Sequence, residues 1–505
     1  MTPTTLTDVP VPPLAAERFA SVLEPGPYRA LLAVRDEASA LLRGRAVWCV
    51  NSTARGGGVA EMLRSLLAYT RGAGVDTRWV VIGGTPAFFA VTKRLHNRLH
   101  GAAGDGGPLG PAEHETYDMV LRAACDELAP RVRPGDVVIL HDPQTAGMAA
   151  AMHAAGAHVV WRSHIGVDTP NDLTREAWDF LGPSLRDVDA FVFSRERFVW
   201  SGLGDRPVTI VPPSIDVFSP KNQELGTDTV GAILSASGLV PGGDEGADPT
   251  FLREDGTPGR VERRAQIVEE QPLAPDDRIV TQVSRWDHLK DPLGVLHGFV
   301  ADTGAYPDAH LVLAGPAMAA VTDDPEGAAV LAEVVAAWRA LPLAARRRVH
   351  LACLDMTDAE ENAAVVNALQ TRAAVVVQKS LAEGFGLTVA EAMWKGRPVV
   401  ASAVGGIQDQ IVDRVSGLLL ADPSDLRAFG RAVSRLLGGP CPRGAAGRGG
   451  PHAGTRAVPR ATSPRAVGRT PAATHRGRVR HPGRGSRRVL NGVRRRRRPA
   501  RRCPP

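Results

Sequence analysis

Short runs of apolar, β-branched residues alternate with helical stretches along most of this chain. A strand followed by a helix, repeated many times, is typical of a parallel sheet with helices on both faces. The alternation occurs in two series, so we expect an α/β protein with two doubly wound parallel sheets. The predicted strands are 46–51, 79–82, 137–140, 158–161, 190–193 and 208–211 in the first series, and 279–283, 310–314, 349–351, 374–377 and 398–401 in the second.

A segment rich in Gly, Asp, Glu and Pro separates the two series, and we interpret it as a linker with an inserted piece that is partly helical or disordered. Ligands of open α/β sheets bind beyond the carboxyl ends of the strands, so we expect a binding cleft between the two sheets. The expected domains are an N-terminal extension at 1–40, a first Rossmann-like domain at 41–220, the linker at 221–277, a second Rossmann-like domain at 278–438 and a tail at 439–505.

The tail begins after an amphipathic helix pattern at 425–437 and differs sharply from the rest of the chain. Residues 439–505 contain 19 Arg and no Lys, Asp or Glu; because the whole 505-residue chain carries a net charge of +6, residues 1–438 carry −13. Few large apolar residues occur in the tail, so we expect it to be disordered. Two interpretations are open: a tail that binds nucleic acid or an anionic surface, densest at 494–498, and a shifted reading frame in a GC-rich gene. The absence of interleaved aromatic residues for base stacking favours the shifted frame.

The rest of the composition bears on the compartment. No apolar run approaches the roughly 18 residues needed to cross a bilayer, and the N-terminus lacks the basic and apolar regions of a secretion signal. The five cysteines, at 49, 125, 353, 441 and 503, have no metal-ligand spacing. We therefore expect a cytoplasmic protein with reduced thiols, no membrane partner, no metal and no cofactor.

Two carboxylates eight positions apart, Glu383 and Glu391, flank a glycine turn just after a predicted strand of the second series. Gly384 and Gly386 allow the backbone to turn sharply and to approach a ligand closely. A helix expected at 387–395 would direct free backbone N–H groups and its positive dipole end toward an anion. Carboxylates beside such a phosphate cradle are suited to accept hydrogen bonds from hydroxyls, as in a nucleotide-linked sugar.

Two cations, Arg285 and Lys290, follow the first strand of the second series. An arginine fork and a lysine point charge at this spacing can clamp a diphosphate. The alternative is a surface salt bridge with Asp287 or Asp291. The acidic unit after a later strand of the same series favours the phosphate interpretation.

The first series contributes a loop of three glycines, Gly56, Gly57 and Gly58, before a helix expected at 61–73. A tight turn is the alternative to a second phosphate-approach loop, and the G-x-G-x-x-G order of dinucleotide-binding proteins is absent. His164 follows the strand at 158–161. The cluster 141–144 follows the strand at 137–140 and is expected to face the same cleft.

These residues together resemble a known family. The spacings Arg285-x4-Lys290 and Glu383-x7-Glu391 are similar to the signature of retaining glycosyltransferases of the GT-B fold, family 4. Further segments resemble the trehalose synthase branch, which includes the glycosyltransferring trehalose synthases and the retaining trehalose phosphorylases. The resemblance extends over residues 27–438, and its segments are 50–53, 56–61, 91–97, 161–165, 282–287 and 378–396.

The resemblance implies a role for each matched residue. Arg285 and Lys290 would neutralise the donor phosphate, and Glu383 would hold hydroxyls of the donor glucose. The implied catalytic residues are Arg285, Lys290, Glu383 and His164. The implied donor-binding residues are Gly57, Gly58, Gly384, Phe385, Gly386, Leu387, Thr388 and Glu391, with Glu391 on the ribose. The residues expected on the acceptor side are Asn51, Asp142, Gln144 and Arg162.

The function that the resemblance implies is a retaining glucosyltransferase that makes trehalose from UDP- or ADP-glucose and glucose, by front-face displacement and without a metal. Two alternatives are a trehalose phosphorylase that uses glucose 1-phosphate and, in another class, nucleic-acid binding through the tail. Whether the chain forms a homodimer is open.

Two departures from the family stand out: Gly166 replaces a usual acid, and the tail replaces helices that brace the N-terminal half. We expect the second departure to lower stability and impair cleft closure.

Overall fold

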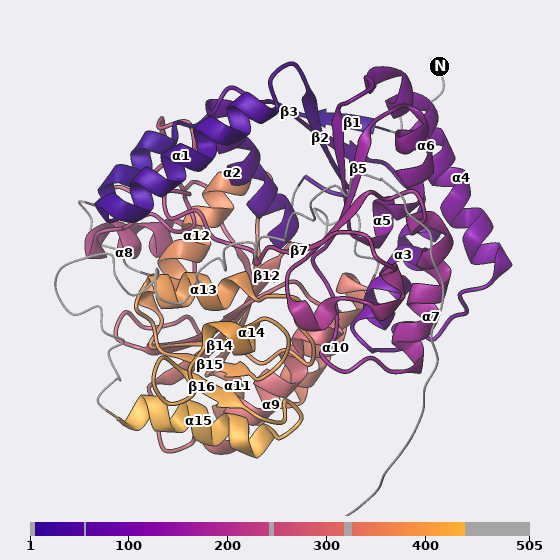
Figure 1. The fold of residues 1–505 in the computed structure, drawn as a ribbon. Coiled ribbons are helices and arrows are strands. Elements are labelled where there is room, and N and C mark those ends of the chain that lie inside the picture. The colour runs from indigo at the N-terminus through magenta and orange to yellow at the C-terminus, as the bar shows by residue number, and fades with distance from the viewer. Residues whose placement is uncertain (1–5, 55–56, 242–246, 318–325, 440–505) are drawn as a thin grey trace, which may run out of the picture. The chain divides into compact units, whose positions relative to one another are not determined.

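The computed structural model describes residues 6–54, 57–241, 247–317 and 326–439 (Figure 1). The predicted tail, apart from Gly439, lies outside the described residues, as does Gly56 of the glycine loop. Within the described ranges, no helix is both long and apolar enough to cross a membrane.

The first sheet has seven strands in the order β1-β3-β2-β4-β5-β6-β7. Strands β2 to β7 pair in parallel, whereas β1 runs antiparallel to β3. The bounds are β1 Leu6–Val9, β2 Ala46–Asn51, β3 Asp76–Ile82, β4 Val137–His141, β5 His158–Ser163, β6 Ala190–Phe193 and β7 Val208–Ile210.

Helices cover both faces of this sheet because successive side chains of a buried strand point in opposite directions. Trp48 and Val50 belong to a core that includes residues of α3 and α4, whereas Cys49 and Trp79 belong to a core with α2. The helix bounds are α1 Pro25–Leu41, α2 Gly58–Gly72, α3 Pro86–Leu99, α4 Pro111–Leu128, α5 Asp142–Thr145, α6 Ala149–Ala154 and α7 Asp172–Leu181.

The second sheet also has seven strands, in the order β10-β13-β12-β11-β14-β15-β16, and a separate hairpin is formed by β8 and β9. Strand β10 is antiparallel to β13, and the other pairs are parallel. The bounds are β8 Thr250–Leu252, β9 Pro258–Arg260, β10 Gln266–Val268, β11 Arg278–Val283, β12 Ala309–Pro316, β13 Val349–Leu354, β14 Val375–Gln378, β15 Val399–Ser402 and β16 Leu418–Leu420.

The second sheet is likewise buried on both faces. Val280 and Leu311 pack in a core with α9, α10 and α15, while Ile279 and Val312 pack in a core with α8 and α12. Helix α15 lies along α9, as Figure 1 shows. The helix bounds are α8 Thr227–Ala236, α9 Pro292–Asp302, α10 Gly327–Ala340, α11 Leu343–Arg346, α12 Ala359–Arg372, α13 Leu387–Trp394, α14 Ile407–Gln410 and α15 Leu426–Gly438.

The predicted fold class, two doubly wound sheets, is confirmed, and every predicted strand overlaps an observed one. Each sheet is mostly parallel and has one antiparallel strand at an edge. Strands β1 and β10 are antiparallel edge strands of three or four residues, mostly exposed or half-buried, so no apolar run marks them in the sequence. Strand β10 and helix α8 come from the segment interpreted as a linker, and α8 packs against α12.

Candidate active site

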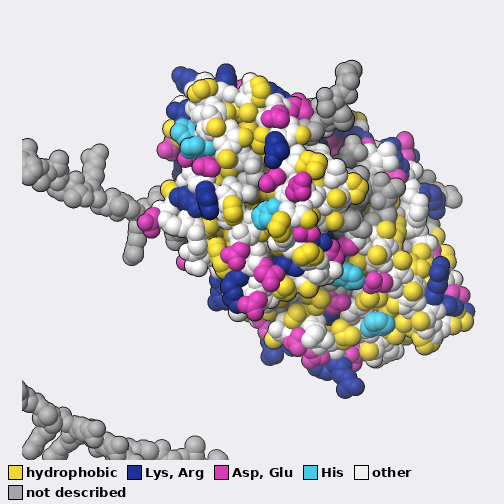
Figure 2. All heavy atoms as spheres, turned by 90° about the vertical axis from the view of Figure 1, so that its right-hand side faces the viewer, with side chains coloured by type: hydrophobic (Ala, Val, Ile, Leu, Met, Phe, Trp, Pro, Cys, Tyr) yellow, Lys and Arg dark blue, Asp and Glu magenta, His cyan; other side chains and the backbone are white. Residues whose placement is uncertain are grey.

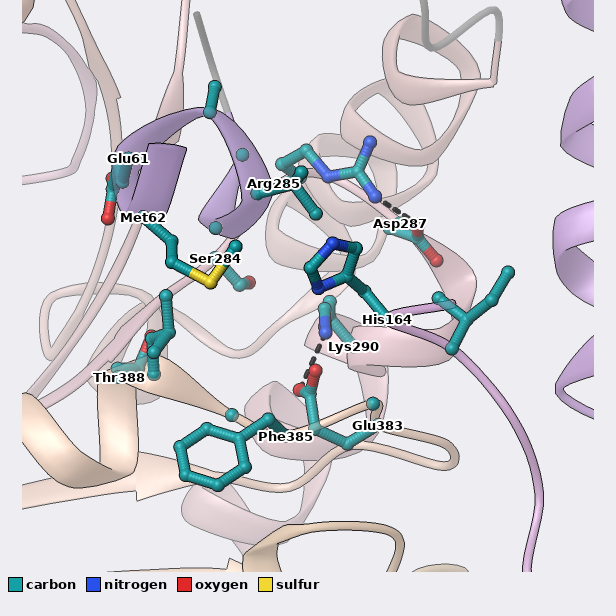
Figure 3. A pocket seen from close by; sticks show the side chains of 18 of the residues that line it. Glu61, Met62, His164, Ser284, Arg285, Asp287, Lys290, Glu383, Phe385 and Thr388 are labelled. Atoms are coloured by element: carbon teal, nitrogen blue, oxygen red, sulfur yellow. Dashed lines mark hydrogen bonds and ion pairs between the residues drawn. The ribbon is translucent and has the colours of Figure 1, made fainter. Parts of the chain in front are cut away.

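A cavity of about 340 Å³ is lined by residues from both sheets (Figure 3). Much of the lining comes from the carboxyl ends of β2, β4 and β5 in the first sheet and of β11, β12, β13 and β14 in the second, with the loops that follow them. Strand ends are where an open α/β sheet binds its ligand.

Glu383 and Lys290 form an ion pair in this cavity, with Nζ of Lys290 2.6 Å from Oε2 of Glu383. Ser380 Oγ and Gln378 Nε2 also donate to this oxygen, at 3.2 and 3.3 Å. Burial disfavours the charge of Glu383, but Lys290, His100 and Ser380 outweigh burial and lower the pKa of the carboxyl below its usual value. The cavity therefore contains a charged carboxylate, which can accept from hydroxyls, beside a cation.

The backbone around Lys290 is held by side chains. Asp287 Oδ1 accepts from the N–H of Leu289 at 2.8 Å, and Gln282 Nε2 donates to the carbonyl of Lys290 at 2.9 Å. Asp291 follows with a φ of +49° and caps α9. The lysine therefore leaves a turn that is constrained on both sides.

Arg285 lines the cavity, and its Nη2 lies 3.6 Å from Oδ2 of Asp287. Asp287 is buried, and the same oxygen accepts from Nζ of Lys93 on α3 at 2.8 Å. Burial disfavours the charge of Asp287, but Lys93, Arg285 and Lys290 outweigh burial and hold its pKa well below the usual range. The expected pair of Arg285 with Asp287 is therefore present, but its carboxylate is buried and also contacts Lys93 of the first sheet's helices.

The glycine turn after Glu383 brings backbone, not side chains, close to the first sheet. A Cβ on Gly384 would lie 2.4 Å from the carbonyl oxygen of His164. Gly386 has a φ of +83° and is the N-cap of α13, whose first residues, Leu387 and Thr388, line the cavity. The N-terminus of α13 is thus close enough to present its N–H groups to an anion.

The glycine loop of the first series lies at the start of α2, where Gly57 and Gly58 line the cavity. A Cβ on Gly58 would come within 3.0 Å of a methyl group of Leu387 on α13. The two predicted phosphate-approach loops therefore meet, one from each sheet.

Asp142, immediately after β4, is a strained residue in the cavity wall, with a φ of +60°. Its Oδ1 accepts from the backbone N–H of His164 at 2.7 Å, and its carbonyl accepts from Nε1 of Trp161 at 3.0 Å. Burial raises the pKa of Asp142 to about 7. His164 also lines the cavity, and its ring lies between Arg285 and Lys290 in Figure 3.

The other expected acceptor residues are placed differently. Gln144 and Asn51 line the cavity, but the amide of Asn51 accepts from Nε1 of Trp79 at 2.8 Å and donates to the carbonyl of Thr53 at 2.6 Å. Arg162 is not among the lining residues: it is buried, with Nη2 3.4 Å from the carbonyl of Val211.

Glu391 is likewise outside the lining and only 1% exposed. Its Oε1 pairs with Nζ of Lys221 at 3.1 Å, and its Oε2 accepts from Nε2 of Gln370 at 3.1 Å. Lys221 does line the cavity, and it also pairs with Glu61 on α2 at 2.8 Å. The first glutamate of the spacing therefore faces the cavity directly, whereas Lys221 lies between the second and the cavity.

Several lining residues were not predicted. They lie on α2, on α3, after the first sheet and on the second sheet, and they are Glu61, Lys93, His96, His100, Lys221 and Gln378. Of these residues, Glu61 could have been identified from the sequence, because it lies in the first turn of the helix that follows the glycine loop. His100 Nδ1 lies 3.0 Å from the carbonyl oxygen of Gly166. A Cβ added to Gly166 would lie 2.4 Å from the ring of Phe198. An acid at position 166 would not fit this arrangement.

Throughout the described ranges, no group of three or more His, Cys, Asp or Glu side chains is placed to hold a metal ion.

Two family models and several curated proteins match this chain. Residues 49–200 match the family model described as "Trehalose synthase, N-terminal domain", and residues 263–448 match "Glycosyl transferases group 1". The trehalose synthases of Rubrobacter xylanophilus and Pyrococcus horikoshii are each 34% identical, over 80% of this chain and over 88% and 83% of their own lengths. The trehalose phosphorylase of Pleurotus pulmonarius is 25% identical, over 80% of this chain and 53% of its own length.

Solved structures agree on the fold. An α,α-trehalose-phosphate synthase (UDP-forming) from Burkholderia xenovorans superimposes with a TM-score of 0.57 at 16% identity, over 80% of this chain and 94% of that one. An E. coli structure bound with UDP-2-fluoro glucose gives a TM-score of 0.56 at 13% identity, over 78% and 91%. The chain is a glycosyltransferase with the GT-B fold and belongs to the trehalose synthase family.

Proposed function

We propose that this protein transfers glucose from a nucleotide-activated donor, UDP- or ADP-glucose, to glucose with retention of configuration, giving trehalose. The observation that carries the proposal is the Lys290–Glu383 ion pair in the cavity, beside the N-terminus of α13. The pair combines a group for phosphate with a group for sugar hydroxyls. The relatives that support the substrate class are trehalose synthases.

The donor phosphates lie against Arg285, Lys290 and the N–H groups at the start of α13. These groups stabilise the negative charge that develops on the leaving phosphate as the glycosidic bond breaks. They take the part that a divalent metal plays in other phosphate sites, so the transfer needs no metal. Gly57 and Gly58 let α2 approach the same phosphates from the other sheet.

The donor glucose lies against Glu383 and His164. The acceptor glucose lies on the first sheet against Asp142 and Gln144, while the engaged amide of Asn51 has less capacity to bind a sugar. The acceptor hydroxyl attacks from the face that the phosphate leaves, and the departing phosphate oxygen takes the hydroxyl proton. Configuration is thereby retained without a covalent enzyme intermediate.

Donor assays test this proposal. The chain is incubated with glucose and, in separate reactions, UDP-glucose, ADP-glucose or glucose 1-phosphate, and the product is identified by ¹³C NMR. We expect α,α-trehalose with a nucleotide donor and release of the nucleoside diphosphate. Trehalose formed only from glucose 1-phosphate would identify a phosphorylase instead, the class of the Pleurotus relatives.

The alternative function, nucleic-acid binding through residues 439–505, is tested separately. On the face seen in Figure 2, basic and acidic side chains are interspersed rather than gathered into one basic patch. We expect no salt-sensitive DNA binding by the full chain. DNA binding that weakens with salt and is lost on deletion of residues 439–505 would instead assign that role to the tail.

A cytoplasmic location and the domain boundaries given above are further parts of the proposal, tested by cell fractionation and limited proteolysis.

A further inference from the structure

Two buried histidines are in contact in the cavity wall. Nδ1 of His141, the last residue of β4, lies 2.9 Å from Nε2 of His164, and the two rings are nearly parallel at 10°. The residue after His141, Asp142, accepts from the backbone N–H of His164. The end of β4 therefore holds His164 at two points, its main chain and its ring.

The contact requires one ring to donate and the other to accept. Burial lowers the pKa of His141 to about 3 and that of His164 well below its usual value, so both rings are neutral at physiological pH. Each neutral imidazole has one N–H and one lone pair. Two arrangements satisfy the 2.9 Å contact: Nδ1–H of His141 donates to His164, or Nε2–H of His164 donates to His141.

The other nitrogen of His141 distinguishes the two arrangements. Nε2 of His141 is buried and has no hydrogen-bond partner among the described residues. If His164 were the donor, this nitrogen would be a buried N–H without an acceptor, which is the rarer and more costly defect in proteins. If His141 is the donor, the unpartnered group is only a lone pair.

We propose that His141 is a positioning residue that donates from Nδ1 and thereby keeps His164 as its Nδ1–H tautomer. His164 then presents an N–H donor to the cavity. A donor there suits an oxygen-rich ligand, either a sugar hydroxyl or a phosphate oxygen. It also removes His164 as a general base, because the lone pair of its Nε2 is occupied by His141. The tautomer stands independently of the proposed transfer, whereas its effect on rate rests on that function.

The tautomer is measured directly by ¹⁵N NMR of the full chain labelled at histidine, with His164 assigned by loss of its signals in a His164→Gln variant. We expect His164 Nδ1 to show the shift of a protonated nitrogen and Nε2 that of an unprotonated one, without titration between pH 6 and 9. A protonated Nε2 on His164 in the full chain would overturn the proposal, whatever the enzyme's activity.

Two variants at position 141 then test the positioning role. In His141→Asn the amide can still donate at the place of Nδ1, so we expect the Nδ1–H tautomer of His164 and most of kcat/KM to be kept. In His141→Leu no donor remains, so we expect His164 to become a mixture of tautomers and kcat/KM to fall roughly tenfold or more. Equal kcat/KM in both variants, or a His164 spectrum in His141→Leu unchanged from that of the original chain, would contradict the role.

The second sheet offers a matched control. His310 Nδ1 lies 3.0 Å from His350 Nε2, and their rings are stacked, but neither residue lines the cavity. His310→Leu breaks this second histidine pair, together with the 3.4 Å contact between His310 Nε2 and Asp277, and we expect it to lower the melting temperature while leaving the His164 signals and kcat/KM unchanged. If His310→Leu lowered kcat/KM as much as His141→Leu, the loss in the latter would be general destabilisation and the positioning role would be refuted.

Discussion

Nζ of Lys221 lies 3.1 Å from Oε1 of Glu391, and only the lysine lines the cavity. Because Lys221 also pairs with Glu61, this one ammonium links α13 of the second sheet to α2 of the first. A donor whose ribose is to reach Glu391 must share the carboxylate with Lys221 or displace it. The two glutamates of the Glu383-x7-Glu391 spacing thus differ in accessibility, and their substitution should differ in effect.

Replacing Glu391 by Gln should weaken use of nucleotide-linked glucose by roughly tenfold or more in kcat/KM, since an amide is a weaker acceptor for ribose hydroxyls and no longer pairs with Lys221. Any activity with glucose 1-phosphate, which has no ribose, should change much less. Steady-state assays with both donors check this, and Glu61→Gln, which breaks only the outer pair of Lys221, is the matched control. Full activity of Glu391→Gln with nucleotide-glucose would refute the ribose role.

Replacing Lys290 by Met or Glu383 by Gln should each lower kcat by on the order of 100-fold, because each removes one half of the group that meets the phosphate and the sugar. The double variant should lose much less than the product of the single losses, since the two side chains act as a pair. Pre-steady-state and steady-state rates of the three variants test this coupling. Independent, multiplicative losses would show that the ion pair has no joint role in turnover.

Replacing Asp142 by Asn should stabilise the protein more at pH 8 than at pH 4. The folded pKa of Asp142 is raised to about 7, so between its unfolded value and pH 7 the folded state keeps a proton that the unfolded chain has released. Stability of the original chain therefore falls as pH rises through this window, whereas Asn does not titrate. We expect the difference in unfolding free energy to grow by about 1–4 kcal/mol between pH 4 and 8 in denaturant titrations. A difference that does not depend on pH would contradict it.

Replacing Asp287 by Asn should destabilise the protein by about 1.5–3 kcal/mol at pH 7, because buried Lys93 loses this carboxylate while it keeps its 3.0 Å pair with Glu326. The folded pKa of Asp287 is depressed, so its contribution is complete above the unfolded value near 4 and is lost as pH falls below it. The difference between original chain and variant should therefore be constant at pH 5–8 and shrink at lower pH. Asp172→Asn, in the exposed pair with Arg175, should change stability little at any pH.

Much of this fold could be predicted because parallel strands that are buried on both faces consist of unbroken apolar runs, as at 375–377. The short edge strand β10 contains no such run. It lies in the segment interpreted as a linker, and it becomes a strand only by pairing with β13, which is distant in the sequence. In the site, the spacings around Arg285 and Glu383 could be read from the sequence because each lies within one short continuous segment. Lys93 and Asp287 are 194 positions apart, so only the packing of one sheet against the other brings them together.

Gly384 meets the backbone carbonyl of His164 with no room for a Cβ, whereas Gly58 faces only a side-chain methyl of Leu387, at 3.0 Å from where its Cβ would lie. For protein engineering, this contact separates lining positions that tolerate substitution from position 384, which does not. A bulkier donor could be accommodated by trimming lining side chains such as Met62 or Thr388. A larger residue at 384 would instead clash with the carbonyl of His164 and force the loops of the two sheets to separate there.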